Sequence, residues 1–297
     1  MKNIGIIGLG DMGIGMASNI VKSGFNLYGF DLREERLNLF KQLGGKSAAS
    51  YQKIAENADI VFIMVLNGAQ VKEIVLGESG LIKYLKPGST IIITATINPS
   101  EVKDLITPLL EKNINLVDSP VSGGKAGADS GTLTLMTAAK KEVLEECKNV
   151  LEAIGQNIFH VGEEIGIGQT VKAALQAFIG ASFTAIFESL VLGVAAGVKA
   201  ETLYEVFSAS GVSSPLFKNS AKLIMDRKFK GTGSHIGTMY KDLGISMNMA
   251  KENGVAMFTA GAAHELFRAG MSLFPEEDNW AIVKLLEQIA GIKVKIQ

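Results

Sequence analysis

Residues 3–13 read N-I-G-I-I-G-L-G-D-M-G, a short β-branched run that ends in a glycine-rich turn. Residues 12–23 then show the apolar spacing of a helix, which Gly24 ends, and residues 26–31 form a second strand-like run. The order of strand, glycine turn, helix and strand is that of a dinucleotide-binding βαβ unit. The sequence therefore predicts a Rossmann-type unit here.

Each glycine of this turn has a separate steric role in such a unit. We expect Gly8 to make the tight turn, Gly10 to let the backbone approach a pyrophosphate, and Gly13 to let the helix pack against the strand. The predicted cofactor-binding residues of the turn are Gly8, Leu9, Gly10, Asp11, Met12 and Gly13. About 18 residues after Gly13, Asp31 ends the second strand, where its carboxylate would accept hydrogen bonds from ribose hydroxyls and repel a 2′-phosphate. NAD is thus favoured over NADP, although Arg33 would soften that repulsion.

The alternation of strands and helices continues through residue 161. Strands are expected at 60–66, 90–94, 115–118, 133–136 and 158–161, and helices at 34–43, after Asn67, from about Pro99 to 112, and at 140–154. This pattern predicts a doubly wound parallel sheet over residues 1–162, whose ligands lie beyond the carboxyl ends of the strands. That rule selects Leu66, Asn67 and residues 94–96, including Thr96, as cofactor-facing, with ordinary turn chemistry as the alternative.

A second glycine-rich stretch, D-S-P-V-S-G-G-K-A-G-A-D-S-G-T-L, covers residues 118–133. Consecutive backbone N–H groups in such a loop can hold a carboxylate or an oxyanion, and Ser122 adds a hydroxyl donor. We predict an anion-binding loop formed by Ser122, Gly123 and Gly124. The alternative is a mobile surface loop.

A long apolar helix is expected over about residues 168–197. Between Lys172 and Lys199 its one charged residue is Glu188, so the helix is either buried on most sides or in a membrane. Gln176, Ser182, Thr184 and Glu188 interrupt it too often for a membrane span, and we expect it to be buried in protein. Lys172 and Gln176 lie one turn apart at its N-terminal end, where a lysine opposes the helix dipole.

Residues 163–297 are predicted to form an all-helical substrate and oligomerisation domain. Helices are expected at 200–210, 215–225 after a capping Ser214, 237–253, 257–269 and 275–289. These short helices cannot cover every face of the long one, so we expect a homodimer or homotetramer through this domain. Lys241 and Asp242 are adjacent and should point to different sides of their helix, with two solvated surface charges as the alternative. His160, His235 and His264 lack metal-ligand spacing and are taken as structural or surface residues.

The composition sets limits on partners and compartment. Among 297 residues the formal net charge is −1, which gives no electrostatic reason to expect nucleic acid or a membrane surface. A single cysteine, Cys147, cannot form an internal disulfide, so we expect a cytoplasmic protein. Asp11 and the neighbouring glycines argue against a signal peptide at the N-terminus.

These motifs together resemble the β-hydroxyacid dehydrogenases, the family of 3-hydroxyisobutyrate dehydrogenase and tartronate semialdehyde reductase. The likeness covers essentially the whole chain through four motifs in the family's order, which are residues 8–20, 118–124, 166–172 and K241-D-L. The resemblance implies that Lys172 is catalytic, that Ser122, Gly123 and Gly124 bind the substrate carboxylate, and that Thr96 and Lys241 approach the nicotinamide.

Departures from the family pattern bear on the substrate. Gln176 stands where the family commonly has asparagine, and V65-L-N-G-A-Q replaces its M-L-P. Together with T94-A-T-I-N-P and E277-D-N-W-A-I-V-K, these two departures look more like the L-threonate dehydrogenase branch. Pro215 and Ser220, however, stand where that branch is expected to have an aromatic residue and an arginine. An NAD-dependent oxidoreductase acting on a C3–C4 hydroxy acid such as L-threonate is favoured. The alternatives are a 3-hydroxyisobutyrate dehydrogenase, a tartronate or succinic semialdehyde reductase, and a non-catalytic dinucleotide-binding module.

The expected mechanism uses Lys172 as general acid and base for the substrate hydroxyl. An ordinary lysine, with a pKa of about 10.4, is a poor base at neutral pH. Burial, Lys241, the nicotinium ring and the helix N-terminus are expected to lower the pKa of Lys172. Gln176 is expected to hold Lys172 or a substrate hydroxyl in place.

Overall fold

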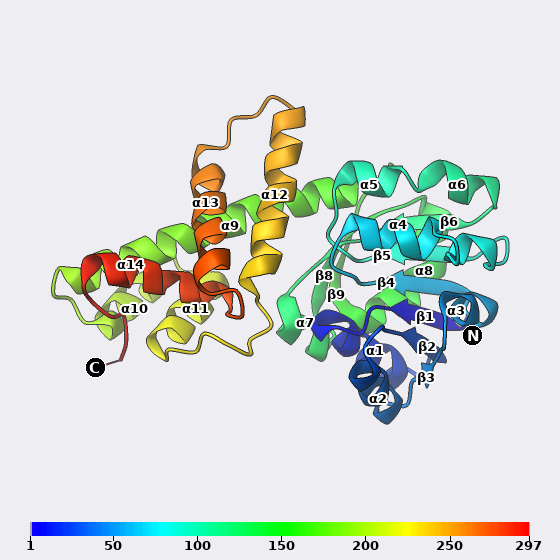
Figure 1. The fold of residues 1–297 in the computed structure, drawn as a ribbon, viewed down its shortest axis with the longest axis horizontal. Coiled ribbons are helices and arrows are strands. Elements are labelled where there is room, and N and C mark those ends of the chain that lie inside the picture. The colour runs from blue at the N-terminus through cyan, green and yellow to red at the C-terminus, as the bar shows by residue number, and fades with distance from the viewer. Residues whose placement is uncertain (1, 297) are drawn as a thin grey trace. The chain divides into compact units, whose positions relative to one another are not determined.

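The computed structural model describes residues 2–296 and divides into two compact units, Met1–Lys172 and Ala173–Gln297. The boundary falls inside the long helix α9 (Ile167–Ala195), so each unit includes part of it. Every strand named below belongs to the first unit, and the elements of the second are helical (Figure 1). The predicted fold class, a Rossmann-type α/β region followed by a helical region, is confirmed.

The first unit is built on one nine-stranded sheet. Its strands run in the order β3-β2-β1-β4-β5-β6-β8-β7, and β9 pairs with β8. The strands are β1 (Ile4–Ile7), β2 (Leu27–Phe30), β3 (Lys46–Ser47), β4 (Ile60–Ile63), β5 (Thr90–Ile93), β6 (Asn115–Asp118), β7 (Val121–Ser122), β8 (Leu133–Ala138) and β9 (Gly155–Gly162). Strands β1 to β6 are parallel, whereas β8 pairs antiparallel with β6 and β7. The parallel strands place their carboxyl ends at one edge, and the loops there are the expected place for a ligand.

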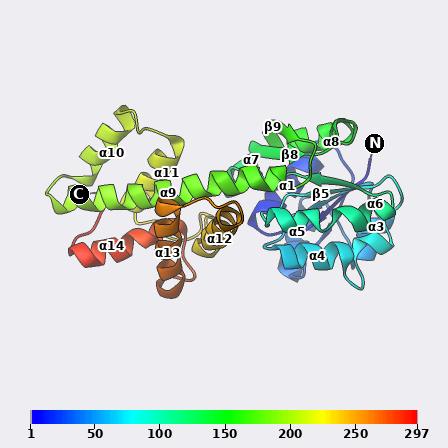
Figure 2. The same ribbon diagram turned by 90° about the horizontal axis from the view of Figure 1, so that it is seen from above.

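Helices cover both faces of this sheet (Figure 2). They are α1 (Asp11–Lys22), α2 (Glu34–Gln42), α3 (Tyr51–Asn57), α4 (Gly68–Leu76), the 3₁₀ helix η1 (Leu81–Lys83), α5 (Pro99–Lys103), α6 (Ile106–Glu111), α7 (Gly124–Ser130) and α8 (Lys141–Ile154). Residues of α1 and α8 pack on one face in a core that includes Ile6 and Phe62. Residues of α3 to α6 pack on the other face with Ile7 and Ile63. The strands are apolar on both faces because both are covered.

Five features of the first unit differ from the predictions. Strand β3 and helix α3 were not expected, and the single helix predicted from Pro99 to 112 is divided into α5 and α6. The glycine-rich stretch after β6 is not a plain loop, because it contains strand β7 and helix α7. The sheet is also mixed and not purely parallel, since β8 runs antiparallel to β6 and β7.

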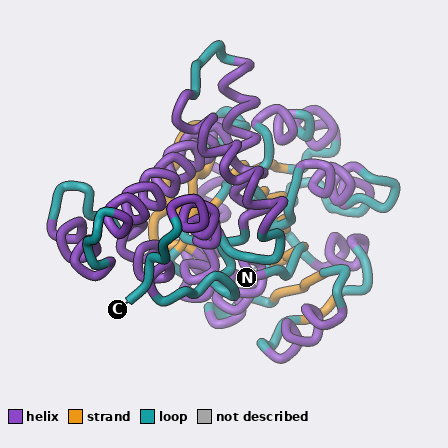
Figure 3. The backbone as a smooth tube through the Cα atoms, turned by 60° about the vertical axis from the view of Figure 1, so that its left-hand side comes forward, coloured by secondary structure: helices purple, strands orange, loops and turns teal. Residues whose placement is uncertain are grey.

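The second unit packs helices around a core of its own (Figure 3). They are the C-terminal part of α9 with α10 (Ala200–Ala209), α11 (Pro215–Met225), α12 (Ile236–Glu252), α13 (Phe258–Leu273), the 3₁₀ helix η2 (Asn279–Ile282) and α14 (Val283–Ala290). Helix α11 matches its prediction, because the Ser214 side chain accepts from the Phe217 amide and Pro215 starts the helix. The helix predicted from 275 begins later, at η2.

Helix α9 is only partly covered by its own chain. Among the described residues it is the one helix long and apolar enough to cross a bilayer, and 39% of its most apolar window is buried. Phe183, Phe187 and Leu190 lie in the core of the second unit, as a core helix of a globular protein requires. Phe178 and Leu192 are 69% and 72% exposed, so the single chain leaves part of this helix uncovered, as expected if the short helices cannot cover its every face.

Candidate active site

The first glycine turn has the shape that a dinucleotide needs. A Cβ atom added at Gly8, whose φ is +94°, would lie 2.1 Å from the carbonyl oxygen of Met64. A Cβ at Gly13 would lie 1.9 Å from the carbonyl oxygen of Gly8, but one at Gly10 would meet nothing closer than Arg33 at 3.7 Å. Gly8 and Gly13 are therefore required by the fold itself, whereas the space beside Gly10 is open to a ligand.

Helix α1 starts at this turn, and its N-terminus can bind an anion. Its N-cap residue is Gly10, and no side chain caps the first turn. Uncapped N–H groups at a helix N-terminus, with the positive end of the helix dipole, form a site for phosphate. Asp11 stands in that first turn and its carboxylate is bound by Arg36 at 3.1 Å, which offsets its charge. These residues fit a pyrophosphate group.

Asp31 is fixed directly beside the same turn. Its Oδ2 accepts from the Leu9 amide at 2.7 Å, and its Oδ1 accepts from the Arg33 amide at 2.9 Å. Burial raises the pKa of the Asp31 carboxyl, but the hydrogen bonds from Arg33 and Leu9 together lower the pKa below its ordinary value. Asp31 is thus a fixed carboxylate at the place where a ribose is expected.

In the loops after β4 and β5, some of the predicted residues form capping or turn hydrogen bonds and one has an exposed side chain. Asn67 caps α4, because its side chain accepts from the Gln70 amide at 2.9 Å, and Gln70 in turn accepts from the Leu66 amide. Thr94 is fully buried and donates to the carbonyl oxygen of Ile63. Asn67 and Thr94 therefore perform ordinary turn chemistry, whereas the side chain of Leu66 is 66% exposed.

The second glycine stretch forms a short, open loop between β7 and α7. Ser122 ends β7, and Gly123 and Gly124 have φ values of +131° and +59°, which few residues with a side chain adopt. A Cβ added at Gly124 would meet nothing within 4 Å, so the space outside its backbone is open. Gly123 is the N-cap of α7 and offers no capping side chain. The loop therefore presents uncapped backbone N–H groups next to the Ser122 hydroxyl, as a carboxylate site needs.

Helix α9 begins on the carboxyl edge of the sheet and carries Lys172 about one and a half turns in. Asp118, the last residue of β6, accepts from the Gly166 amide at 2.9 Å and from the Gln169 side chain at 3.0 Å. A Cβ at Gly168 would lie 2.5 Å from the carbonyl oxygen of Met136, so the helix start rests directly on the sheet. Lys172 is only 6% exposed, which is unusual for a lysine.

Two of the predicted residues, Gln176 and Lys241, belong to the second unit, as does Asp242. Lys241 Nζ lies 2.8 Å from Asp242 Oδ1, and Gln176 Nε2 donates to Asp242 Oδ2. The expectation that Lys241 and Asp242 point to different sides is therefore wrong. The flexible lysine stem reaches back to the buried carboxylate, which is 3% exposed and is no surface charge. Asp242 instead holds both of the predicted polar residues.

The histidines take part in other contacts. His160 Nε2 lies 2.8 Å from the carbonyl oxygen of Ala139, and the His264 ring stacks on Tyr240. His235 Nδ1 lies 3.5 Å from Asp278 Oδ1. Within residues 2–296, no group of three or more His, Cys, Asp or Glu residues is arranged to hold a metal ion.

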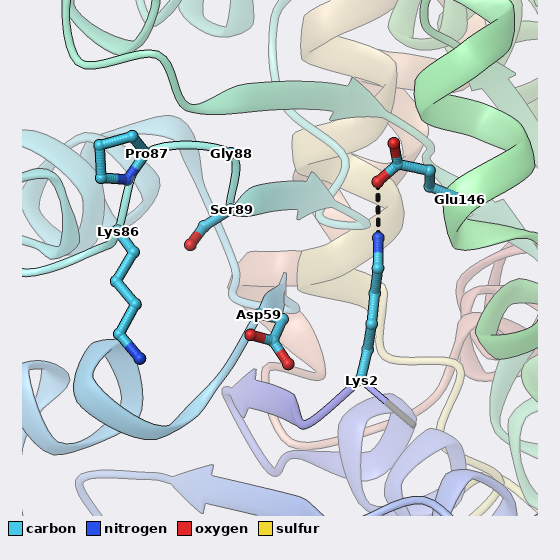
Figure 4. A pocket seen from close by; sticks show the side chains of 7 residues that line it. All are labelled: Lys2, Asp59, Lys86, Pro87, Gly88, Ser89 and Glu146. Carbon is cyan, nitrogen blue, oxygen red and sulfur yellow. Dashed lines mark hydrogen bonds and ion pairs between the residues drawn. The ribbon is translucent and has the colours of Figure 1, made fainter.

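An open cavity of about 490 Å³ lies at the opposite edge of the sheet (Figure 4). Its lining includes Asp59 and Ser89, which directly precede β4 and β5, and Lys2, which lies two residues before β1. Lys2 forms an ion pair with Glu146 across the cavity. Ligands of such sheets bind beyond the carboxyl ends of the strands. This cavity lies at the amino ends, away from the glycine turn and Lys172, and is not the active-site candidate.

Sequence reasoning missed several residues that build the site. The roles of Asp118 and Gln169 were not predicted, although Asp118 is polar at a strand end and Gln169 precedes Lys172 by three residues on a helix. Asn19 was also missed, and its side chain donates to the carbonyl oxygen of Ala128 in α7. For Asn19 nothing local in the sequence gives a signal, because its partner is more than 100 residues away.

The fold and the glycine-turn site define a nicotinamide-dinucleotide-binding oxidoreductase. Residues 3–162 match the family model described as the NAD binding domain of 6-phosphogluconate dehydrogenase. Residues 166–286 match the one described as NAD-binding of NADP-dependent 3-hydroxyisobutyrate dehydrogenase. The two matched ranges follow one another along the chain and together cover most of it.

Individual relatives extend over nearly the full length. A 2-(hydroxymethyl)glutarate dehydrogenase of Eubacterium barkeri is 36% identical over 98% of this chain and 97% of its own. An L-threonate dehydrogenase of Cupriavidus necator is 33% identical over 97% of each. The crystal structure of a 3-hydroxyisobutyrate dehydrogenase from Salmonella typhimurium is 28% identical, covers 96% of this chain and 100% of its own, and has a TM-score of 0.88.

The chain belongs to the β-hydroxyacid dehydrogenase family. It is a dehydrogenase that acts on the CH–OH group of a hydroxy acid with a nicotinamide dinucleotide. The non-catalytic alternative is therefore wrong.

Proposed function

We propose that this dehydrogenase oxidises a C3–C4 hydroxy acid, with L-threonate-like acids favoured, using NAD and with Lys172 as the general acid and base. The burial of Lys172 carries the proposal, since its side chain is 6% exposed at the start of a helix that rests on the carboxyl edge of the sheet. Desolvation and the helix N-terminus both disfavour an ammonium group there, which suits a base that works near neutral pH.

In the forward direction the neutral amine of Lys172 takes the proton of the substrate hydroxyl. Bound NAD supplies the acceptor for the hydride that leaves the carbon bearing this hydroxyl, so the C–OH group becomes a carbonyl. Lys172 returns the proton to the oxygen in the reverse direction. Ser122, Gly123 and Gly124 hold the substrate carboxylate through the hydroxyl and the uncapped N–H groups of their loop.

The choice of NAD is supported by the fixed carboxylate of Asp31. Its oxygens accept from Leu9 and Arg33 and still have lone pairs for ribose hydroxyls. A 2′-phosphate in the same place would meet a carboxylate that is 8% exposed. The Arg33 guanidinium binds that same carboxylate at 3.2 Å, which favours Asp31 over Arg33 as the group that selects the cofactor.

The relatives supply a second candidate substrate. The 36% identical relative is a 2-(hydroxymethyl)glutarate dehydrogenase, and this acid has a second carboxylate that L-threonate lacks. The Ser220 hydroxyl, which stands where an arginine was expected, donates to the carbonyl oxygen of Leu216 within its own helix. That position therefore offers no cation to a second carboxylate, and the smaller acids remain favoured. Further candidate substrates are 3-hydroxyisobutyrate and the tartronate and succinic semialdehydes.

Turnover of a panel of acids tests the substrate. Protein and NAD are mixed in turn with L-threonate, 3-hydroxyisobutyrate, L-serine and 2-(hydroxymethyl)glutarate, and NADH absorbance is followed. The two semialdehydes are run with NADH in reverse. We expect the highest kcat/KM for L-threonate. A higher value for 2-(hydroxymethyl)glutarate would replace the first candidate by the second.

Lys172→Ala tests the mechanism in the same assay. The variant should lose turnover by about 10³-fold or more and keep NAD binding, because its side chain is needed only for proton transfer. Calorimetry with NAD gives the binding control, and Lys172→Met keeps more of the buried volume. A Lys172→Ala enzyme that retained most of kcat would sink the lysine assignment.

We also propose that a second copy of the chain covers the exposed face of α9, as a homodimer or homotetramer. Within the second unit an apolar groove of about 400 Å³ is lined by alanines of α9 together with Phe178, Met257 and Phe258. Phe178 and Phe258 are 69% and 88% exposed, which is unusual for phenylalanine on a monomer. Light scattering after size exclusion should give a multiple of 31.6 kDa, and Phe178→Asp should lower it. A monomeric wild type would contradict this proposal.

A cytoplasmic setting, without nucleic acid or membrane as partner, remains part of the proposal. Its support is the net charge of −1 and the single cysteine, Cys147, which is fully buried. Burial raises the pKa of its thiol to about 11, so it is poorly reactive. Cell fractionation tests the compartment, and recovery with the membrane fraction would overturn it.

A further inference from the structure

The first turn of α9 is tied to two neighbouring loops of the sheet by one side chain, that of Gln169. Its Nε2 donates to Asp118 Oδ1 and to the carbonyl oxygen of Ala95, both at 3.0 Å. Its Oε1 accepts from the Ile97 amide, also at 3.0 Å. Gln169 is fully buried, so these three bonds are made away from water and fix its conformation.

These contacts bracket Thr96. The two backbone groups that Gln169 holds belong to Ala95 and Ile97, the residues on either side of Thr96. The position of Thr96 after β5 is therefore set by a side chain of α9 and not by the sheet alone. Thr96 is the residue of this loop that is expected to approach the nicotinamide.

The same side chain lies three residues before Lys172 on the helix. Residues at this spacing share one side of a helix, so Gln169 and Lys172 belong to consecutive turns of the same face. Asp118 fixes the turn below, because its Oδ2 also accepts from the amides of Gly166 and Gln169 at 2.9 and 3.2 Å. The start of the helix is thereby held against rotation about its axis and sliding along it.

We infer that Gln169, held by Asp118, is a positioning residue that sets Lys172 in register with the loop carrying Thr96. The inference rests on the proposed function, in which Lys172 moves the hydroxyl proton and Thr96 lies at the nicotinamide end. Proton and hydride leave neighbouring atoms of one substrate, so the groups that receive them must be held together to within a fraction of an ångström. Gln169 makes that link through one side chain, whose conformation is fixed by its three hydrogen bonds.

Gln169→Leu tests this inference with little change in volume. The variant removes all three hydrogen bonds and leaves the Ile97 amide and the Ala95 carbonyl without their partner. We expect kcat for the best acid of the panel to fall roughly 10- to 100-fold, with the Kd for NAD changed less than about threefold. Amide exchange of residues 95–97 should quicken, and this measurement needs no substrate.

Two controls separate positioning from general loss of stability. Ile54→Ala empties a fully buried site in α3, which lies against Gly5 away from the carboxyl edge, and should lower the melting temperature while kcat stays near wild type. In a Lys172→Ala background, Gln169→Leu should cause no further loss of the residual rate, because Gln169 acts through the lysine.

The outcomes distinguish this inference from the proposed function. Retention of kcat by Lys172→Ala would end the lysine mechanism and the inference with it. Loss in Lys172→Ala with kcat unchanged in Gln169→Leu would overturn the inference alone. Unchanged exchange of residues 95–97 in Gln169→Leu, or losses that multiply in the double variant, would also overturn it.

Discussion

The side-chain amide of Asn19 donates to the carbonyl oxygen of Ala128 at 2.8 Å. Asn19 lies in α1, which follows the dinucleotide turn, and Ala128 lies in α7, which follows the Ser122–Gly124 loop. The two helices approach so closely that a Cβ at Gly15 would lie 2.7 Å from the carbonyl carbon of Ala128. The cofactor turn and the carboxylate loop are therefore parts of one packed assembly.

Changing Asn19 should weaken binding of the hydroxy acid more than binding of the dinucleotide. Asn19 Nδ2 also reaches the carbonyl oxygens of Gly15 and Asp129, so Asn19→Ala should lower the free energy of unfolding by about 1–2 kcal/mol. Because α7 loses its hydrogen bonds to Asn19, KM for the acid should rise several-fold while the Kd for NAD stays within about twofold. Steady-state kinetics and calorimetry measure the two.

Asn19→Asp is the sharper form of that test. The aspartate is nearly the same size, but its carboxylate would face carbonyl oxygens at the C-terminal end of α7, where negative charge is unfavourable. It should therefore be less stable than Asn19→Ala at neutral pH. Equal KM values for the acid in wild type and both variants would show that the helix contact does not shape the carboxylate loop.

Gly10 and Gly13 should respond to alanine in opposite ways. A Cβ at Gly10 meets open space, and its φ of −63° suits alanine, so Gly10→Ala should change stability by less than about 0.5 kcal/mol. The new methyl group occupies the space of the pyrophosphate, and NAD affinity should fall by about 100-fold. In Gly13→Ala the methyl group clashes with the carbonyl oxygen of Gly8, and the free energy of unfolding should fall by about 3 kcal/mol or more.

Melting curves of the two variants measure the effect of each alanine on stability, and NAD titrations measure its effect on cofactor binding. If Gly10→Ala bound NAD as wild type does, the pyrophosphate could not lie beside Gly10. If Gly13→Ala melted at the wild-type temperature, the close contact between α1 and the end of β1 would not be essential to the fold.

The contrast between those glycines shows what the sequence could predict. Gly8, Gly10, Gly13 and Asp31 lie in one local βαβ unit, so their spacing alone indicated a turn, an approach site and a packing contact. Helix α11 was equally local, because Ser214 and Pro215 mark its start.

Elements that depend on distant partners were missed for a physical reason. Strand β3 has two residues, both exposed, and so carries no apolar pattern. Helix α7 reads G-K-A-G-A-D-S, a poor helix former by propensity, and it packs against α1, which is distant in the sequence. The bond between Asp118 and Gln169 joins residues 51 apart, which no local pattern reveals.

Asp31 should determine the choice of cofactor. Asp31→Asn keeps an oxygen for the Leu9 amide but removes the charge, and it frees the Arg33 side chain, which is 50% exposed, to meet a 2′-phosphate. We expect kcat/KM for NADP to rise about 10-fold or more and kcat/KM for NAD to fall. Arg33→Ala in the same background should reverse the gain. An unchanged ratio of NAD to NADP would remove Asp31 from this role.

Asp118 should give the protein a distinct dependence of stability on pH. Burial raises the pKa of its carboxyl from 3.8 to about 6, against the lowering effect of the N–H groups of Gln169, Gly166 and Gly168. Between these two values the folded state holds a proton that the unfolded state has released. The stability from this group is therefore full below about pH 4 and is lost as the pH rises through about 6, by an amount on the order of 3 kcal/mol.

The Asp118→Asn variant isolates that effect, because asparagine does not titrate and every other group is shared. The melting temperature of wild type relative to Asp118→Asn should decrease from about pH 4.5 to about pH 7, measured by calorimetry at constant ionic strength. At neutral pH Asp118 is ionised and accepts from three N–H donors, which asparagine cannot match, so kcat of the variant should also be lower there. A difference in melting temperature that stayed constant with pH would show that Asp118 titrates as an ordinary carboxyl.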